Sequence, residues 1–204
     1  MIITKLERQK KKERFNVHLD GEYAFAIDAD TLLNFRGLRV GNEIDESEVL
    51  AIQKEGEKRS AYARAFSYVS RGMHTLKEVR DKLKKLAYTD DAVTYAVDRL
   101  AGLNLVNDRA YAVAYVETHH GRGKLRLTHE LKAKGVDRKV IDEVLACVLE
   151  EEMEIEEATT LAIKFYHSLG DKTKVQRRLL TRGYSYSVIE RAVSAAIKDG
   201  DDEF

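Results

Sequence analysis

The stretch KLRLTHELKAKGVDRKVIDEVLACV, residues 124–148, decides the fold, because residues 76–100 and 172–196 repeat its apolar pattern at shifts of 48 residues. The shift needs no gap. The coinciding apolar residues are Val79, Leu127 and Val175; Leu83, Leu131 and Leu179; Val93, Ile141 and Ile189; Val97, Leu145 and Val193. Self-similarity at a fixed period is typical of repeat proteins, so we predict three tandem units.

Each unit is predicted to hold three helices. The expected ranges are 60–71, 108–119 and 156–168 for the first helix, 76–86, 125–134 and 173–182 for the second, and 90–101, 138–149 and 186–198 for the third. Ala87, Gly135 and Gly183 share one place between the second and third helices, and Thr89, Asp137 and Ser185 follow as expected N-caps. Residues 75–78, Thr-Leu-Lys-Glu, form a predicted capping box.

The N-terminal segment has a different pattern. Residues 3–7 and 15–19 alternate apolar and polar side chains, Asp20-Gly21 is a hairpin turn signal, and 23–27 follows as a partner strand. A short helix is expected from Asp30 to near Gly37, and another over 45–58. The charged run from Arg8 to Arg14 is interpreted as a solvated hairpin tip, with phosphate contact as the alternative.

The expected fold class is therefore mainly all-α, with three tandem three-helix repeats in an elongated body after an N-terminal β-hairpin and short helix. The predicted divisions are 1–58 for the N-terminal extension, 59–107, 108–155 and 156–198 for the repeats, and 199–204 for an acidic tail. Proline is absent from all 204 residues, which favours uninterrupted helices because proline breaks their interiors.

Composition excludes several protein classes. The 35 Lys and Arg residues equal the 35 Asp and Glu residues in number, so the chain is not basic throughout. Cys147 is the only cysteine, so an internal disulfide and a cysteine zinc site are excluded. We predict a buried structural thiol there and a cytoplasmic location. No apolar run is long enough for a signal peptide or a membrane span.

No residue constellation for chemistry is found. His119, His120 and His129 come closest to a metal-binding group, but adjacent histidines on a helix point about 100° apart and no acidic ligand recurs nearby. No glycine-rich phosphate loop and no nucleophile-elbow motif occurs. We therefore expect no catalytic residues, no metal and no cofactor.

The charge distribution favours a binding surface. Residues 71–85, 119–139 and 171–191 carry six, seven and six Lys or Arg against two acids each, whereas 140–157 carries eight acids and no Lys or Arg. Solvated helix faces would explain one such cluster, but recurrence in three units favours a polyanion or a charged partner. The residues predicted to bind it are Arg122, Lys124, Arg126, Arg177, Arg178 and Arg182.

Three stretches of the chain resemble the RecX family, the bacterial modulators of the RecA recombinase. They are Asn107–Ala112, His120–Arg126 with Glu130–Val136, and Leu76–Leu83. The resemblance covers residues 60 to about 197 and implies a non-catalytic regulator with an elongated, curved body of three-helix repeats. Such proteins are expected to lie in the groove of the RecA–DNA filament, inhibit its ATPase and strand exchange, and promote its disassembly.

The resemblance also implies an association with single- or double-stranded DNA, and we expect a monomer with no membrane contact. Two alternatives remain open from the residues themselves. One is a direct DNA-binding regulator that uses the tri-helical units as helix-turn-helix readers. The other is a helical-repeat scaffold for a different protein. Because the second helices offer mostly Lys and Arg, with Gln176 the main exception, contact with phosphates or acidic groups fits better than base reading.

Overall fold

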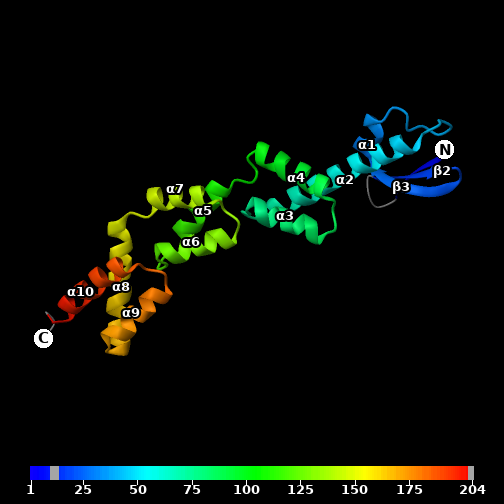
Figure 1. Ribbon diagram of the computed structural model, residues 1–204. Helices are drawn as coiled ribbons and strands as arrows, with labels where there is room; N and C mark the ends of the chain where they lie inside the picture. Colours follow the sequence, from blue (N-terminus) through cyan, green and yellow to red (C-terminus); the bar gives the residue numbers. More distant parts are fainter. Residues whose placement is uncertain (10–13, 202–204) are drawn as a thin grey trace. The chain divides into compact units, whose positions relative to one another are not determined.

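The computed structural model of the chain describes residues 1–9 and 14–201 and divides into two compact units (Figure 1). The first unit comprises Met1–Gly72 and Val79–Leu105, and the second comprises Met73–Glu78 and the chain from Val106 onward. Two parts of the predictions, the lysines at 10–12 and the last three residues of the acidic tail, lie outside the described residues.

The N-terminal segment forms the predicted hairpin. Its antiparallel sheet has the order β1 (Ile3–Arg8), β2 (Arg14–Leu19) and β3 (Glu22–Asp28). The β2–β3 turn places Asp20 and Gly21 at φ 50° and 93°, which suits a short polar residue and a glycine. The alternating apolar residues of these strands form one buried cluster with residues of the segment that follows.

The helices of the first unit correct one prediction. They are α1 (Ala29–Asn34), α2 (Glu46–Val69), α3 (Leu76–Lys85), whose first turn belongs to the second unit, and α4 (Asp90–Gly102). The separate helices expected over 45–58 and 60–71 form the single helix α2, so Ser60 lies within a helix rather than at its start. Asp45 and Glu48 form a capping box at its beginning, and the chain carries no proline to interrupt it.

The predicted capping box of α3 is confirmed. The backbone N–H of Thr75 donates to the Glu78 carboxylate, and the Glu78 N–H donates to the Thr75 hydroxyl, both at 3.2 Å. Helix α4 packs against α2. Its apolar face, predicted from spacing, is buried at Val93, Ala96 and Val97.

The second unit continues the repeat pattern. Its helices are α5 (Asp108–Thr118), α6 (Lys124–Ala133), α7 (Arg138–Val148), α8 (Glu151–Leu169), α9 (Lys172–Thr181) and α10 (Tyr186–Asp201). Two apolar clusters hold it, one formed by α5, α6 and α7 and the other by α8, α9 and α10. Helices α8 and α10 pack against each other (Figure 1).

Helix α8 begins earlier than predicted. Its first turn contains Glu151, Glu152 and Glu154, so most of the acidic segment interpreted as a linker before residue 156 is helical. Acidic side chains in the first turn favour a helix because they interact with the positive end of its dipole. Glu156 therefore lies within α8 rather than at its start.

The buried thiol predicted at Cys147 is wrong, because Cys147 is exposed. Helix α7 buries Ile141, Val144 and Leu145, and position 147 lies about 200° around the helix from Leu145. The mainly helical fold class with three-helix units and an N-terminal sheet is confirmed. The six domain boundaries and the elongated, curved shape stay predictions.

Candidate partner-binding surface

The six residues predicted to bind a partner all lie in the second unit, on or beside α6 and α9. Lys124, Arg126, Arg177 and Arg178 are exposed, whereas Arg122 and Arg182 are half-buried. The structure brings the end of α9 against the beginning of α6, so Arg182 meets the turn before α6. Arg177 lines a separate cavity of about 340 Å³ with Gln176 and Tyr186.

Backbone hydrogen bonds seat the beginning of α6 on the turn after α9. The N–H of Gly123 donates to the carbonyl of Arg182 at 2.9 Å, and the N–H of Leu125 donates to that of Gly183 at 3.0 Å. These bonds satisfy donors at the beginning of α6 that have no partner within the helix. We call this contact, between residues 121–126 and 182–184, the α6 seat.

Glycine is required on both sides of the α6 seat. A Cβ at Gly123 would lie 2.3 Å from the backbone nitrogen of Tyr184, and a Cβ at Gly183 would lie 2.4 Å from that of Arg126. Gly183 also has φ 87°, a left-handed conformation that disfavours a side chain. The shared place of Ala87, Gly135 and Gly183 is confirmed as a helix-ending turn, since all three have positive φ.

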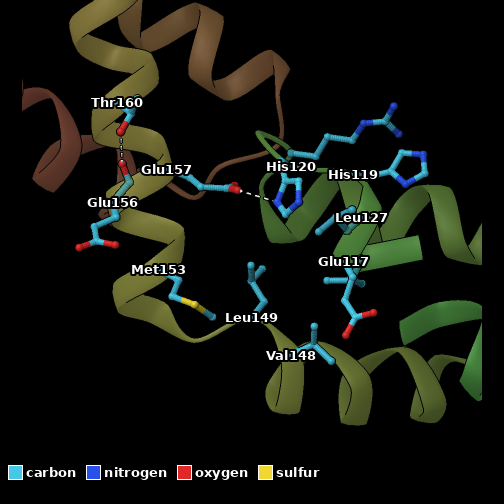
Figure 2. A pocket seen from close by; sticks show the side chains of 12 residues that line it. Glu117, His119, His120, Leu127, Val148, Leu149, Met153, Glu156, Glu157 and Thr160 are labelled. Atoms are coloured by element: carbon cyan, nitrogen blue, oxygen red, sulfur yellow. Dashed lines mark hydrogen bonds and ion pairs between the residues drawn. The ribbon is translucent and has the colours of Figure 1, made fainter. Parts of the chain in front are cut away.

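Two glutamates of α8 complete the seat. Glu154 is only 6% exposed, and its carboxylate accepts from the N–H of Lys124 at 2.8 Å. Glu157 accepts from the N–H of Gly121 at 3.0 Å and contacts Nδ1 of His120 at 3.2 Å, as Figure 2 shows. Carboxylates placed here face the positive end of the α6 dipole.

Sequence reasoning assigned these acids to an exposed acidic stripe, and for Glu154 this interpretation is wrong. A signal was present in its spacing. Glu154 precedes Ala158 and Ala162 at steps of four residues, so it stands on the buried stripe of α8. An acid at an apolar position needs a buried partner, and the α6 backbone supplies it.

A second cluster neutralises two of the predicted cations. Arg122 forms an ion pair with Glu130, and Arg126 forms another at 2.9 Å, while the Tyr115 hydroxyl donates to the same carboxylate at 3.1 Å. Partial burial alone would raise the pKa of Glu130, but the hydrogen bonds from Arg126, Arg122 and Tyr115 outweigh it and hold that pKa below its usual value. The hydrogen bond to Glu130 raises the pKa of Arg122.

Two other cations lie over an aromatic ring. The guanidinium groups of Arg178 and Arg182 lie 4.8 and 5.6 Å from the centre of the Phe165 ring. Arg182 also donates to the carbonyl of Gly121 at 3.1 Å, on the other side of the α6 seat. Such cation–π contacts orient a guanidinium while leaving its charge in place.

Lys124 and Arg177 are different from the other four residues. Neither side chain forms an ion pair with a residue in the described part of the chain, and both are exposed. With the exposed Arg178, they are the cations of the predicted set whose charge is most available to a partner. Arg122, Arg126 and Arg182 make contacts that hold the fold around them.

A cavity of about 440 Å³ lies beside the α6 seat. Val116, Leu127, Val148, Leu149 and Met153 supply its apolar lining, and the His120–Glu157 pair stands at its edge (Figure 2). Across residues 1–9 and 14–201, no group of three or more His, Cys, Asp or Glu side chains is arranged to hold a metal ion.

Comparison with known proteins decides the family. Family models match three parts of the chain: the Regulatory protein RecX N-terminal domain at residues 1–45, the first RecX three-helix domain at 61–100 and the second at 107–145. The Regulatory protein RecX of Bacillus licheniformis is 35% identical over 98% of this chain and 79% of its own length. That of Clostridium botulinum is 36% identical over 96% of both chains. The chain belongs to the RecX family.

A solved structure supports the same assignment. A crystal structure of regulatory protein RecX aligns with a TM-score of 0.74 and 34% identity, covering 93% of this chain and 97% of the other. RecX is a family of regulatory proteins, so this chain is a regulatory protein and not an enzyme. Among the helices that the structure describes, none has the length and apolar character needed to cross a membrane.

The backbone contact of the α6 seat has a counterpart 48 residues earlier, within the same unit. Residues Met73–Glu78 contact the turn after α6, where the Thr75 hydroxyl donates to the carbonyl of Lys134 at 2.7 Å and Nζ of Lys77 donates to that of Ala133 at 3.0 Å. The N–H of Leu76 donates to Asp108 at 2.8 Å. We call this contact the α3 seat. RecX repeats in this chain thus meet through one recurring contact.

Proposed function

We propose that this chain binds the RecA–DNA filament and lowers its ATP turnover and strand exchange, acting as a monomer in the cytoplasm. The observation that supports this function most strongly is membership of the RecX family, because the family resemblance implies RecA as the target. The repeated basic second helices agree with a polyanionic filament as the partner.

Within this proposal, the six basic residues have two roles. Lys124, Arg177 and Arg178 contact DNA phosphates or acidic groups of RecA, because they are exposed. Arg122, Arg126 and Arg182 orient the beginning of α6 and the end of α9, because they form the internal contacts of these segments. Guanidinium groups suit such partners because they bind phosphate and carboxylate in a bidentate manner.

The test is a double substitution, Lys124→Ala with Arg177→Ala, in an assay of RecA ATP turnover on single-stranded DNA. We expect weaker inhibition at every chain concentration. The dependence of binding on salt should also become shallower, by about 0.7 in the log–log slope for each lost contact to a single-stranded phosphate. Neither side chain pairs with a described residue, so circular dichroism should show unchanged helicity.

The matched control is Lys139→Ala with Lys164→Ala. These two lysines are exposed in the same unit, on α7 and α8, and the control should inhibit RecA like the unchanged chain. Equal inhibition by the test and control variants would contradict the proposed surface. Unchanged inhibition of RecA together with lost binding to free DNA would favour the alternative of a direct DNA-binding regulator.

A further inference from the structure

A cavity in the first unit has no place in the proposed RecA-binding surface. Its volume is about 380 Å³, and it lies between strands β2 and β3 and one face of α2. Its lining contains three arginines, Arg14, Arg59 and Arg64, against one acid, Asp28. Unpaired acidic groups would cancel this positive charge, so the contacts of each charged residue decide whether an anion can bind.

The three guanidinium groups come from separate elements. The side chain of Arg14, on β2, donates to the carbonyl of Ala26 at 3.1 Å, which fixes it along the strand and leaves its charge without a carboxylate partner in that contact. Arg59 and Arg64 lie five residues apart on α2. Arg64 is exposed and pairs with no acid among the described residues.

The acids of this region are already engaged. The carboxylate of Asp28 accepts from the N–H of Thr31 and caps α1. Glu55 pairs with Arg59 at 3.0 Å, and Asp30, itself exposed, approaches Arg59 at 3.6 Å. Of the three arginines, Arg59 is therefore partly neutralised, while Arg14 and Arg64 keep the lining positive.

Hydroxyl groups complete the lining. Ser60 and Tyr88 are hydrogen-bonded to each other at 2.9 Å, and Ser67 lies on the same face of α2. A hydroxyl carries one donor and two acceptor sites, so each can still bind another oxygen. Gly56 keeps one wall low, since a Cβ there would meet only Ile27, at 3.9 Å.

From these contacts we infer that the cavity is a binding site for a phosphate group joined to a sugar, as in a nucleic-acid strand or a free nucleotide. Several guanidinium groups with nearby hydroxyls match the oxygens of a phosphate, which Arg binds in a bidentate manner. The volume falls within the range of about 300–1,000 Å³ for small-ligand sites and exceeds what a bare phosphate needs. This site is independent of RecA and of the basic residues of the second unit.

The test measures binding of a fluorescein-labelled oligothymidylate to the full chain by anisotropy, without RecA. Two variants address the cavity: Arg64→Ala removes its unpaired cation, and Ala63→Glu adds a negative charge at an exposed lining position. We expect Arg64→Ala to weaken binding about tenfold, the size of one charge-assisted contact, and to lower the salt slope by about 0.7. Ala63→Glu should weaken binding further.

Arg39→Ala serves as the matched control, because Arg39 is an exposed arginine of the same unit outside the cavity lining. Binding equal to that of the unchanged chain in both cavity variants would overturn the inference. Competition by ATP at low concentration would identify a free nucleotide as the source of the phosphate, whereas competition by unlabelled oligothymidylate alone would identify the strand. Lys124→Ala with Arg177→Ala, which tests the RecA-binding surface, should leave the effect of Arg64→Ala unchanged.

Discussion

The α3 seat and the α6 seat are two versions of one contact, and they differ in how closely the chains approach. A shift of 48 residues converts Thr75 to Gly123 and Lys134 to Arg182. At the α3 seat, side chains of Thr75 and Lys77 donate to the carbonyls. At the α6 seat, backbone N–H groups donate directly.

The closer approach at the α6 seat follows from residue size. Gly123 has no side chain, so its backbone can reach the turn after α9, whereas Thr75 holds the corresponding segment away by the length of its side chain. An acid from the following helix completes both contacts, Asp108 for the N–H of Leu76 and Glu154 for that of Lys124. The comparison shows that one repeat register can be kept while side-chain bonds replace backbone bonds.

The largest expected effect is at the α6 seat, from Gly183→Ala. The new Cβ would meet the backbone of Arg126, and the residue would keep φ 87°. A left-handed alanine costs about 1–2 kcal/mol and overpacking adds about 1–3 kcal/mol, so we expect a loss of about 3 kcal/mol in the free energy of unfolding, measured in urea.

Two other glycines provide the controls for this substitution. Gly170→Ala has a similar positive φ but open space around it, so it should lose only the backbone part, about 1–2 kcal/mol. Gly135→Ala, at the α3 seat, should fall between them, because its new Cβ would meet the side chain of Lys77 and not backbone. Equal losses at Gly183 and Gly170 would contradict the closer approach at the α6 seat.

An intermediate effect is expected at the ion-pair cluster beside the α6 seat. The pKa of Glu130 lies below its usual value of 4.5, so the charged carboxylate stabilises the fold above that pH, and this stability is lost as the pH falls through the lower, folded-state pKa. Glu130→Gln should cost about 1–3 kcal/mol at neutral pH, since Arg122 and Arg126 lose a charged partner.

The same substitution should also flatten the decrease of stability between neutral pH and pH 4 and below. Urea unfolding of both chains across this range measures the difference. An identical acid dependence of the two chains would show that Glu130 is not the titrating group. Glu78, which pairs with Lys134 beside the α3 seat, would then be the next group to test, because its pKa is also lowered.

The smallest effect is expected at Ala87, the first-unit counterpart of Gly135 and Gly183. Ala87 has φ 61°. Glycine there would remove about 1–2 kcal/mol of backbone strain but would lose about 0.4–1 kcal/mol through the greater freedom of the unfolded chain. Ala87→Gly should therefore stabilise the chain by about 0.5 kcal/mol, seen as a small rise in the thermal midpoint. A destabilisation of the chain would contradict this balance.

The sequence alone predicted most of the local structure, because helix periodicity and capping depend on neighbouring residues. The ranges of α3, α4, α6, α7 and α9 and the N-terminal hairpin agree with prediction to within two residues at each end. The errors occurred where no local signal marks a boundary, as within α2 and at the beginning of α8. Exposure of Cys147 was missed because its angular position on α7 was taken to be part of the apolar stripe.

The candidate site was predictable only in part. The sequence identified a repeated basic surface because charge clusters can be counted in each unit, and the 48-residue period determined which residues correspond. Only the tertiary structure decided that Arg122 and Arg126 share Glu130, that Arg182 and Glu154 hold the turn and first residue of α6, and that Lys124 and Arg177 remain without an ion pair among the described residues. Pairing depends on distances between side chains far apart in sequence, and a period fixes correspondence between repeats but not those distances.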